Sequence, residues 1–423
     1  MGFNAIFALA VFVVVLAIII SEKIHRTVIS LCGVCLILLV GVLSPENALE
    51  HVDFNTIGLL IGMMIIVGIV KETGVFEYLA IYAAKKVKGD PWKILLSLCV
   101  ITAITSAFLD NVTTVLLIVP MTFVITKTLD IDPIPFLIPE ILASNIGGTA
   151  TLIGDPPNIM IGSQVGLSFM DFVVNLGPIS IVVFIVTFAV LKIIYKNKFD
   201  VSEDRKQKIM KLDEKVCIKD HSLLKKSLFV LGLVLLGFFT HSLIGYEPSL
   251  IALTGAALLL LLSGSSVEDA LHSVEWPTIF FFAALFVLVG ALREAGLIDL
   301  LAEEVIAITE GNLLVTGVVL IWFSAIVSAF VDNIPFVATI IPMVQAMGAA
   351  GMNVDSLWWA ISLGACLGGN GTLIGASANV VVAGLAEKHG YPLSFGRFLK
   401  LGFPMMILSI ILSTIYMVIF YFI

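Results

Sequence analysis

One polar motif occurs twice in this chain, once in each half, and each time it lies inside apolar sequence. Residues 106–111 read SAFLDN and residues 328–333 read SAFVDN. An ionisable side chain inside a membrane is costly and usually marks a functional site. Because the Asp-Asn pair recurs at equivalent places, the pattern indicates a membrane transporter with a binding site at these pairs. The two pairs are Asp110-Asn111 and Asp332-Asn333.

The composition agrees with a chain that lies mostly in a bilayer. Hydrophobic residues make up 59% of it and charged residues 13%, whereas an ordinary soluble domain has about 25% charged residues. Apolar runs long enough to cross a bilayer core of about 30 Å recur from end to end. The first run is not followed by a signal-peptidase motif, so we expect it to be a retained span. A catalytic constellation is not visible in the apolar spans, and we do not expect an enzyme.

The repeat predicts an all-α polytopic membrane protein with two inverted-topology repeats of five spans each. Every repeat also carries one re-entrant hairpin, and one of its spans is a broken helix. The first repeat is expected at 1–195, with its hairpin around 94–126 and its broken span at 136–162. The second is expected at 227–423, with its hairpin around 314–348 and its broken span at 357–384. The other spans are predicted near 3–20, 27–43, 55–70, 173–195, 227–243, 249–264, 276–291 and 401–423.

Basic residues set the expected orientation. The polar stretch 196–226 contains ten lysine and arginine residues, and such loops stay on the cytoplasmic side. Counting spans outward from this linker puts both termini outside a plasma membrane. Equivalent segments of the two halves then face opposite sides, as inverted repeats do. Glu268, Asp269 and Glu275 are acidic residues in a segment expected to be cytoplasmic, but acidic residues contribute little to orientation.

Glycines mark the two broken spans. Gly147-Gly148 with the GDPP segment at 154–157, and Gly368-Gly369 with Gly371 and Gly375, should interrupt their helices. Freed carbonyl and amide groups at membrane depth can bind ions when they line a cavity. Two plainer interpretations stay open. The Asp-Asn pairs could cap helix N-termini, and the glycines could allow helices to pack closely.

The acidic residues are unequal between the halves. The first half has Asp110, Glu140 and Asp155 where the second half has only Asp332. Burial favours the protonated form of a carboxyl group, so these four residues are candidates for proton coupling. The motifs themselves contain no lysine or arginine, so an anion would find only amides, helix dipoles and a co-bound cation.

The candidate ion-binding or substrate-binding residues follow from these motifs. A sodium ion, the only cofactor-like ligand expected, is assigned to the two Asp-Asn pairs. The complete set is Asp110, Asn111, Thr113, Asn145, Gly147, Gly148, Thr149, Thr151, Asp155, Asn158, Asp332, Asn333, Gly368, Gly369, Asn370, Thr372 and Asn379.

Two segments resemble the ion transporter superfamily. These are SAFLDNVTT at 106–114 and NIGGTATLIGDPPN at 145–158. Within the superfamily the chain is similar to the citrate-transporter-like group, which includes arsenite permeases, sodium/proton antiporters of the NhaD type and the melanosomal P protein. The resemblance implies a homodimer with a scaffold and a moving transport domain that works by elevator-type alternating access. Related dicarboxylate carriers have Ser-Asn-Thr at the hairpin tips, and the Asp-Asn pairs here depart from that pattern.

Together these observations predict a secondary active ion transporter coupled to sodium or protons. Sodium/proton exchange is the first expectation, and efflux of arsenite or a related small anion is the second. A sodium-coupled di- or tricarboxylate symporter and a passive anion channel on the same scaffold are the alternatives. The expected partners are a small ion and the lipid bilayer, and nucleic acid is not among them.

Overall fold

The computed structural model describes residues 2–21, 23–196, 199 and 201–423, and this part of the chain is helical without any strand. Nine of the described helices are long and apolar enough to cross a membrane, which confirms a multi-pass helical membrane protein. The helices are α1 (Phe3–Ser21), α2 (Arg26–Val40), α3 (Pro45–Glu50), α4 (Phe54–Glu72), α5 (Val75–Lys86), α6 (Pro91–Phe108), α7 (Asn111–Leu129), α8 (Ile134–Thr149), α9 (Pro156–Val165), α10 (Phe169–Tyr195), α11 (Glu203–Met210), α12 (His221–Ile244), α13 (Pro248–Ser263), α14 (Val267–His272), α15 (Trp276–Glu294), α16 (Leu297–Thr309), α17 (Leu313–Phe330), α18 (Asn333–Ala349), α19 (Leu357–Gly368), α20 (Ser377–Lys388) and α21 (Phe395–Met417).

The starts of the helices repeat along the chain, and the number of residues between equivalent helices equals the number between the two copies of the Asp-Asn motif. This number is called the offset below. Each of the helices α2 to α7 has a counterpart, α13 to α18, whose first residue is displaced by this offset, as Arg26 of α2 and Pro248 of α13 illustrate. The sequence repeat slips by one position after the hairpins, and the helices follow it, since α9 begins at Pro156 and α20 at Ser377. The opposite membrane orientation of the two halves, and the predicted repeat boundaries, stay predictions.

The predicted spans all coincide with helices, and both predicted hairpins are pairs of consecutive helices, α6–α7 and α17–α18. The length of these hairpin helices, 17 to 19 residues, does not by itself distinguish a re-entrant hairpin from two full spans. The short helices α3 and α14 and the amphipathic helices α5 and α16 were not predicted from the sequence. Their mixed composition hid them, although each pair again keeps the offset of the motif.

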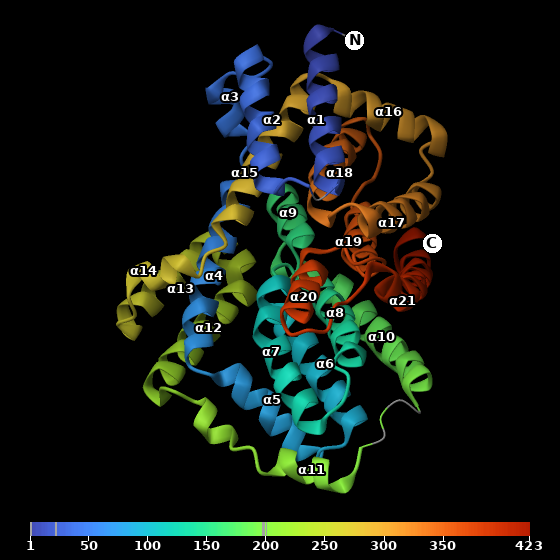
Figure 1. Ribbon diagram of the computed structural model, residues 1–423. Helices are drawn as coiled ribbons and strands as arrows, with labels where there is room; N and C mark the ends of the chain where they lie inside the picture. The colour runs from blue at the N-terminus through green and yellow to red at the C-terminus, as the bar shows by residue number, and fades with distance from the viewer. Residues whose placement is uncertain (1, 22, 197–198, 200) are drawn as a thin grey trace.

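The helices pack into two groups. The first group consists of α1, α2, α4, α12, α13 and α15, which contact mainly one another, and the second group consists of α6 to α10 and α17 to α21. Helix contacts between the groups are sparse and involve mainly α15 with α18, α4 with α7 and α9, and α10 with α12. Figure 1 shows α1, α2 and α16 at one end of the molecule and α5 and α11 at the other, with α8, α9 and α20 between them.

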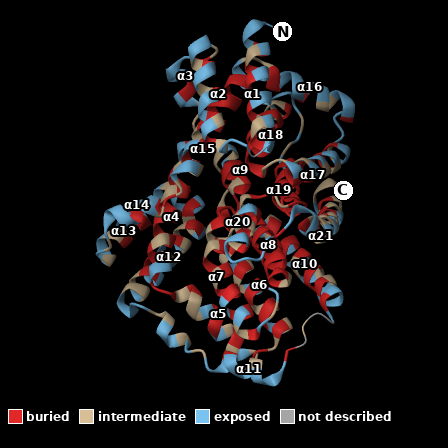
Figure 2. Ribbon diagram, in the orientation of Figure 1, coloured by how far each residue is buried: buried red, intermediate tan, exposed pale blue. Residues whose placement is uncertain are grey.

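Burial is greatest in the second group. Every residue of α8 from Phe136 to Thr149 and every residue of α19 is buried, whereas α3, α11 and α16 are largely exposed (Figure 2). A helix that is apolar on all sides must be enclosed by protein or lipid. The broken helices therefore form the centre of the protein, where they can position a site away from lipid.

The predicted linker 196–226 includes α11 and a short 3₁₀ helix at Glu214–Cys217, and residues 197, 198 and 200 lie outside the described part. It packs along α5, where Lys85 contacts both Glu214 and the carbonyl of Leu212. The linker is thus held against the end of the molecule that carries α5 (Figure 1).

Candidate functional site

Four carboxylates of the candidate site each stand immediately before the first residue of a helix. Asp110 precedes α7, Asp155 precedes α9, Glu275 precedes α15 and Asp332 precedes α18. The positive end of a helix dipole favours a negative charge at such a position. Asp110 accepts a hydrogen bond from the Thr113 amide at 2.8 Å, so the capping interpretation is correct for this residue.

Asp332 also caps its helix in the second hairpin, but its Oδ1 accepts a hydrogen bond from the Ile334 amide at 3.0 Å. Pro335 stands where the first hairpin has Thr113, and proline has no N–H to donate. These caps fix the hairpin tips because they satisfy amides that the helix cannot pair itself. Each cap uses one carboxylate oxygen, so the other oxygen of each aspartate is available for a different partner.

The broken spans are tied to the hairpins by matching hydrogen bonds. The hydroxyl of Thr151 donates to the carbonyl of Ala107, and the hydroxyl of Thr372 donates to the carbonyl of Ala329. Equivalent positions thus make equivalent contacts in the two halves. The first break is the segment 150–155 between α8 and α9, and the second break is the segment 369–376 between α19 and α20. Each break is held against the helix that leads into the neighbouring hairpin tip.

In each break, one asparagine side chain donates a hydrogen bond to an equivalent backbone carbonyl. The Nδ2 of Asn158 donates to the Thr151 carbonyl at 2.8 Å, and the Nδ2 of Asn379 donates to the Thr372 carbonyl at 2.9 Å. Carbonyl groups freed by the helix break are therefore paired by a side chain. Buried polar groups without such partners would cost stability.

The glycines serve close packing, one of the interpretations left open by the sequence. A Cβ on Gly147 would lie 2.1 Å from the Ala103 carbonyl oxygen, and a Cβ on Gly368 would lie 2.6 Å from that of Ala325. The helix α8 continues through Gly147 and Gly148 and ends at Thr149. The helix therefore breaks between Thr149 and Pro156, inside the predicted broken span 136–162.

Gly148 and Gly369 pack against the far ends of their own breaks. A Cβ on Gly148 would lie 2.6 Å from the Gly154 carbonyl oxygen, and a Cβ on Gly369 would lie 3.1 Å from that of Gly375. Each break is thus a tight loop whose two ends touch through glycine.

An amide network joins the first hairpin to the second break. Asn145 accepts a hydrogen bond from Asn111 at 3.3 Å, and it donates to Asn370 at 2.9 Å and to Asn379 at 3.1 Å. Thr149 supports this residue because its hydroxyl donates to the Asn145 carbonyl at 2.7 Å. Candidate residues from separate sequence motifs are therefore connected in space by hydrogen bonds.

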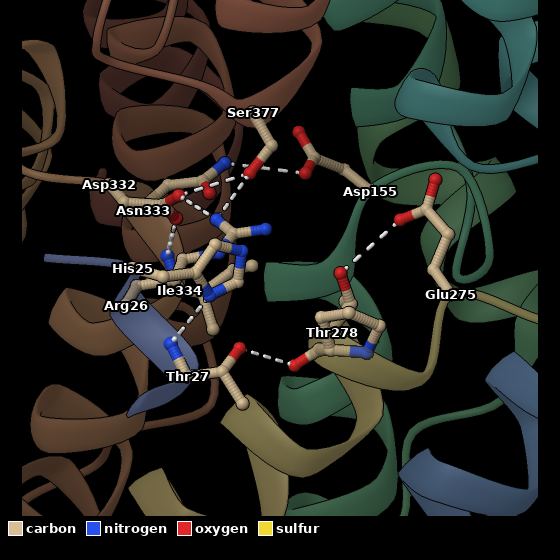
Figure 3. Close-up of polar contacts among 11 residues, drawn as sticks. His25, Arg26, Thr27, Asp155, Glu275, Thr278, Asp332, Asn333, Ile334 and Ser377 are labelled. Carbon is tan, nitrogen blue, oxygen red and sulfur yellow. Dashed lines mark hydrogen bonds and ion pairs between the residues drawn. The ribbon is translucent and has the colours of Figure 1, made fainter. Parts of the chain in front are cut away.

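The first break is connected to the second hairpin in turn. The Nδ2 of Asn333 donates to Oδ1 of Asp155 at 3.3 Å (Figure 3). The other oxygen of Asp155, Oδ2, is buried and has no hydrogen-bond partner. A buried carboxylate oxygen without a partner is costly, so this atom is available to a proton or a cation.

A small cavity lies where the hairpin tips meet the first break. Asp110, Asn111, Asp155 and Asn333 line it, together with Arg26, Glu275 and Ser377, which the sequence motifs did not predict. Glu275 accepts a hydrogen bond from the Thr278 hydroxyl at 3.2 Å (Figure 3). The cavity therefore combines three carboxyl groups with one guanidinium group.

Arg26 comes from the start of α2 and reaches the second hairpin tip. Its Nη1 lies 2.6 Å from Oδ2 of Asp332 and 2.7 Å from the hydroxyl of Ser377, and Ser377 itself donates to Asp332 at 3.0 Å (Figure 3). The guanidinium carbon lies 5.0 Å from the centre of the Phe281 ring, a cation–π distance.

A second, larger cavity adjoins the first, and the two share Arg26, Val112, Glu275 and Ser377 in their walls. Its other lining residues are mostly apolar and include Ile20 and Phe330. Asp332 lies in the wall of this second cavity and its side chain is 11% exposed.

Arg26, Glu275 and Ser377 were missed because no motif contains them. The expectation that an anion would meet no basic side chain at these motifs is wrong, since Arg26 contacts Asp332 from a position 306 residues earlier. One signal for Glu275 was present: Asp53, its equivalent in the first half, also precedes a helix. Arg26 has no such counterpart, because the equivalent position is Pro248.

Glu140 lies apart from the cavity. It is fully buried on α8, where Oε1 accepts a hydrogen bond from the Thr122 hydroxyl at 2.6 Å and Oε2 has no partner. It lines neither of the two cavities described above. Its candidacy for proton coupling has no geometric link to the other carboxylates.

No three His, Cys, Asp or Glu side chains of the described part converge on a point where they could hold a metal ion. The carboxylates instead surround the cavity. This arrangement differs from the multi-carboxylate cages that bind calcium, and a monovalent ion needs fewer charged ligands.

The chain matches a known transport family and several of its members. Residues 16–364 match the family described as citrate transporter. A protein named as an uncharacterized transporter in Mycobacterium tuberculosis is 42% identical over 426 residues, which cover 99% of both chains. The 46 kDa membrane protein of Mycobacterium leprae is 43% identical over 420 residues, 98% of both chains. The human P protein is 37% identical over 497 residues, which cover 97% of this chain and 59% of the P protein.

Two solved structures share the fold. The YdaH transporter of Alcanivorax borkumensis aligns with a TM-score of 0.57 at 14% identity, over 98% of this chain and 97% of that one. MtrF of Neisseria gonorrhoeae, described with a class of antimetabolite efflux pumps, aligns with a TM-score of 0.61 at 13% identity, over 100% and 96%. At such identities the likeness concerns the fold alone.

Proposed function

The chain belongs to the citrate transporter family, and we propose that this membrane transporter exchanges sodium ions for protons by secondary active transport. The exchange uses the cavity between the hairpin tips and the first break. Asp155 and Asp110 take up the cation or proton there, with Asn111 and Asn333 as neutral oxygen ligands.

The charge balance of the site is the observation that carries this proposal. Among the described residues that line the two adjoining cavities, Asp110, Asp155, Glu275 and Asp332 face one guanidinium group, that of Arg26. When all four carboxyl groups are ionised, their negative charges exceed the one positive charge of Arg26 by three. Uncompensated charge away from water is costly, so the site requires cations or protons to be stable.

Movement of a small anion, such as arsenite or a related oxyanion, is the second candidate. The observation that favours it is Arg26, whose guanidinium group uses only Nη1 in its contacts with Asp332 and Ser377. Arginine has five N–H donors, so the remaining ones can hold an anion. A trivalent anion such as citrate fits less well, because one guanidinium group cannot balance it beside four carboxylates.

The two helix groups support an alternating-access mechanism of the elevator type. Contacts between the groups are few compared with those inside each group, so the second group, which carries both hairpins and both breaks, can move as a unit. We also propose a homodimer in the plasma membrane, with the 196–226 linker in the cytoplasm and both termini outside.

Flux measurements in proteoliposomes test the function. Vesicles that contain the purified chain receive a sodium gradient or a proton gradient, and flux of the other ion is recorded together with uptake of arsenite, citrate and chloride. Exchange predicts that each gradient drives the other ion. Flux that continues when both gradients are collapsed and follows the membrane potential alone indicates a passive channel and contradicts the proposal.

A further inference from the structure

The ion pair of Arg26 and Asp332 links the two helix groups. Arg26 is the first residue of α2 in the first group, whereas Asp332 precedes α18 and Ser377 begins α20, both in the second group. The pair is partly enclosed, with side-chain exposures of 25% for Arg26 and 11% for Asp332. Relative movement of the groups must therefore separate a guanidinium group from a carboxylate that is largely removed from water.

The first hairpin offers the internal comparison. Asp110 holds the equivalent place there and also caps its helix, but it forms no ion pair in the part of the chain that the structure describes. Proline stands at position 248, where the repeat would place a second arginine. The cation at the hairpin tip is therefore a feature of the second half and not a requirement of the fold.

The oxygens around Nη1 of Arg26 are those that a small cation would use. Oδ2 of Asp332 at 2.6 Å and the hydroxyl oxygen of Ser377 at 2.7 Å approach the same nitrogen. A carboxylate and a hydroxyl oxygen are hard ligands suited to a sodium ion or to a proton-bearing site. The positive charge of Arg26 occupies the position where such an ion would sit.

We propose that Asp332 and Ser377 form a subsite for the transported monovalent cation, and that Arg26 is a tethered competitor that occupies it in this state. The inference rests on the proposed cation exchange. When the groups move apart, Asp332 loses Arg26 and must take up a cation. When they return, Arg26 displaces that cation into the adjoining cavity.

This competition makes exchange obligatory. An empty carrier cannot leave the present state, because separation would leave Asp332 without a counter-ion, and removing one partner of a buried pair is strongly unfavourable. The second group therefore moves only with a cation or proton bound. Without Arg26 and the Asp332 charge, the empty carrier would move freely and the protein would leak.

The test compares two fluxes of radioactive sodium from proteoliposomes of the full chain, in alkaline buffer so that protons are scarce, with the membrane potential clamped at zero. The first flux, called exchange, is measured into external buffer that contains sodium. The second flux, called net efflux, is measured into external buffer that contains choline instead. In the wild-type protein we expect exchange to exceed net efflux by about tenfold or more. In the Arg26→Gln/Asp332→Asn double variant the ratio should fall to within about twofold of one.

Two further variants keep the result interpretable. Arg26→Lys retains the positive charge and should retain a high ratio. The pair Arg397→Gln/Asp132→Asn removes another arginine–aspartate contact, of 2.7 Å, which lies inside the second group between α21 and the segment before α8. That control should keep the wild-type ratio, and the ratio is independent of how much protein is active.

The outcomes separate the two proposals. A wild-type ratio near one, or a double variant that keeps the wild-type ratio while Arg26→Lys does too, overturns the tethered-competitor role and leaves cation transport standing. A wild-type protein that moves no sodium in either buffer overturns the proposed exchange itself, and the role of Arg26 with it.

Discussion

Asp155 shows most clearly how one residue departs from the repeat to create chemistry. Its counterpart is Ala376, so the second half lacks a carboxylate where the first half has one with an unpartnered buried oxygen. Asp155 precedes α9 but makes no capping hydrogen bond. Because Asp155 does not cap its helix and leaves one buried oxygen without a partner, helix capping does not account for it, and we assign it to ion binding.

The packing role of Gly147 gives a prediction for a single residue. We expect Gly147→Ala to destabilise the protein by about 1–3 kcal/mol or more, because the new methyl group would overlap the backbone of α6, 2.1 Å from the Ala103 oxygen. Gly232→Ala is the matched control, since a Cβ there meets nothing within 4 Å. The temperature at which half of the detergent-solubilised protein aggregates should fall for the first variant and not for the second. Equal values would contradict the packing role.

The site residues differ in how far sequence could predict them. Asp110 and Asp155 stand inside repeated motifs in apolar sequence, so their place was visible. Arg26 stands at the start of an apolar span, where basic residues are ordinary, and its partner is 306 residues away. Glu140 has the burial expected of a functional acid but contacts Thr122 on α7. Burial could be anticipated from the sequence, whereas the direction of a side chain could not.

The hairpins, the breaks and the connecting segments could be predicted from the sequence to different degrees. Long apolar helices and both helix pairs were predictable from hydrophobicity and from the repeat. The first break lies inside the predicted broken span, but the packing of Gly147 against α6 could not be read from the sequence. The helices α5 and α16 escaped notice because they are amphipathic, which is a weaker signal than a continuous apolar run.

The linker contact with α5 predicts a pH effect outside the membrane. The hydrogen bond from Lys85 lowers the pKa of Glu214. A lowered pKa means that the contact contributes fully above the usual glutamate value of about 4.3 and is lost as the pH falls through the lower value in the folded protein. The linker should therefore stay attached at neutral pH and detach in strong acid.

Limited proteolysis measures this attachment. At neutral pH, trypsin should cut the linker of Glu214→Gln faster than that of the wild-type protein. In strong acid, where the contact is lost in the wild-type protein too, pepsin should cut both linkers at the same rate. Asp204→Asn, an exposed acid on α11, is the control and should behave like the wild-type protein. Equal trypsin rates for all three proteins would show that the Lys85–Glu214 contact does not hold the linker.

Two cavities in the described part of the chain, here called vestibules, lie at turns between helices. The first vestibule is the larger cavity near the turn between α1 and α2, and it shares wall residues with the proposed ion-binding cavity. A second one, between α4, α9 and the turn from α12 to α13, shares no lining residue with it. The turns are equivalent in the repeat. If the halves are inverted, these vestibules open to opposite sides of the membrane. The proposed ion-binding cavity shares lining residues with the first vestibule and none with the second.

Cysteine labelling tests that inversion. Val381→Cys lies in the first vestibule and Ser242→Cys in the second, each in a background where Cys32, Cys35 and Cys217 are serine. The buried Cys99 and Cys366 stay. A membrane-impermeant thiol reagent should label Val381→Cys only in inside-out vesicles and Ser242→Cys only in right-side-out vesicles. Labelling of both positions from one side would contradict the inverted arrangement.

The most direct measurement is proton flux driven by a sodium gradient in proteoliposomes of the wild-type protein, of Asp155→Asn and of Asp299→Asn, an exposed acid on α16. We predict equal flux for the wild-type and Asp299→Asn proteins. For Asp155→Asn we predict a loss of about tenfold or more, as expected when a coupling free energy of about 1–3 kcal/mol is removed. Sodium-driven proton flux that is unchanged in Asp155→Asn would contradict the assignment of cation coupling to this cavity.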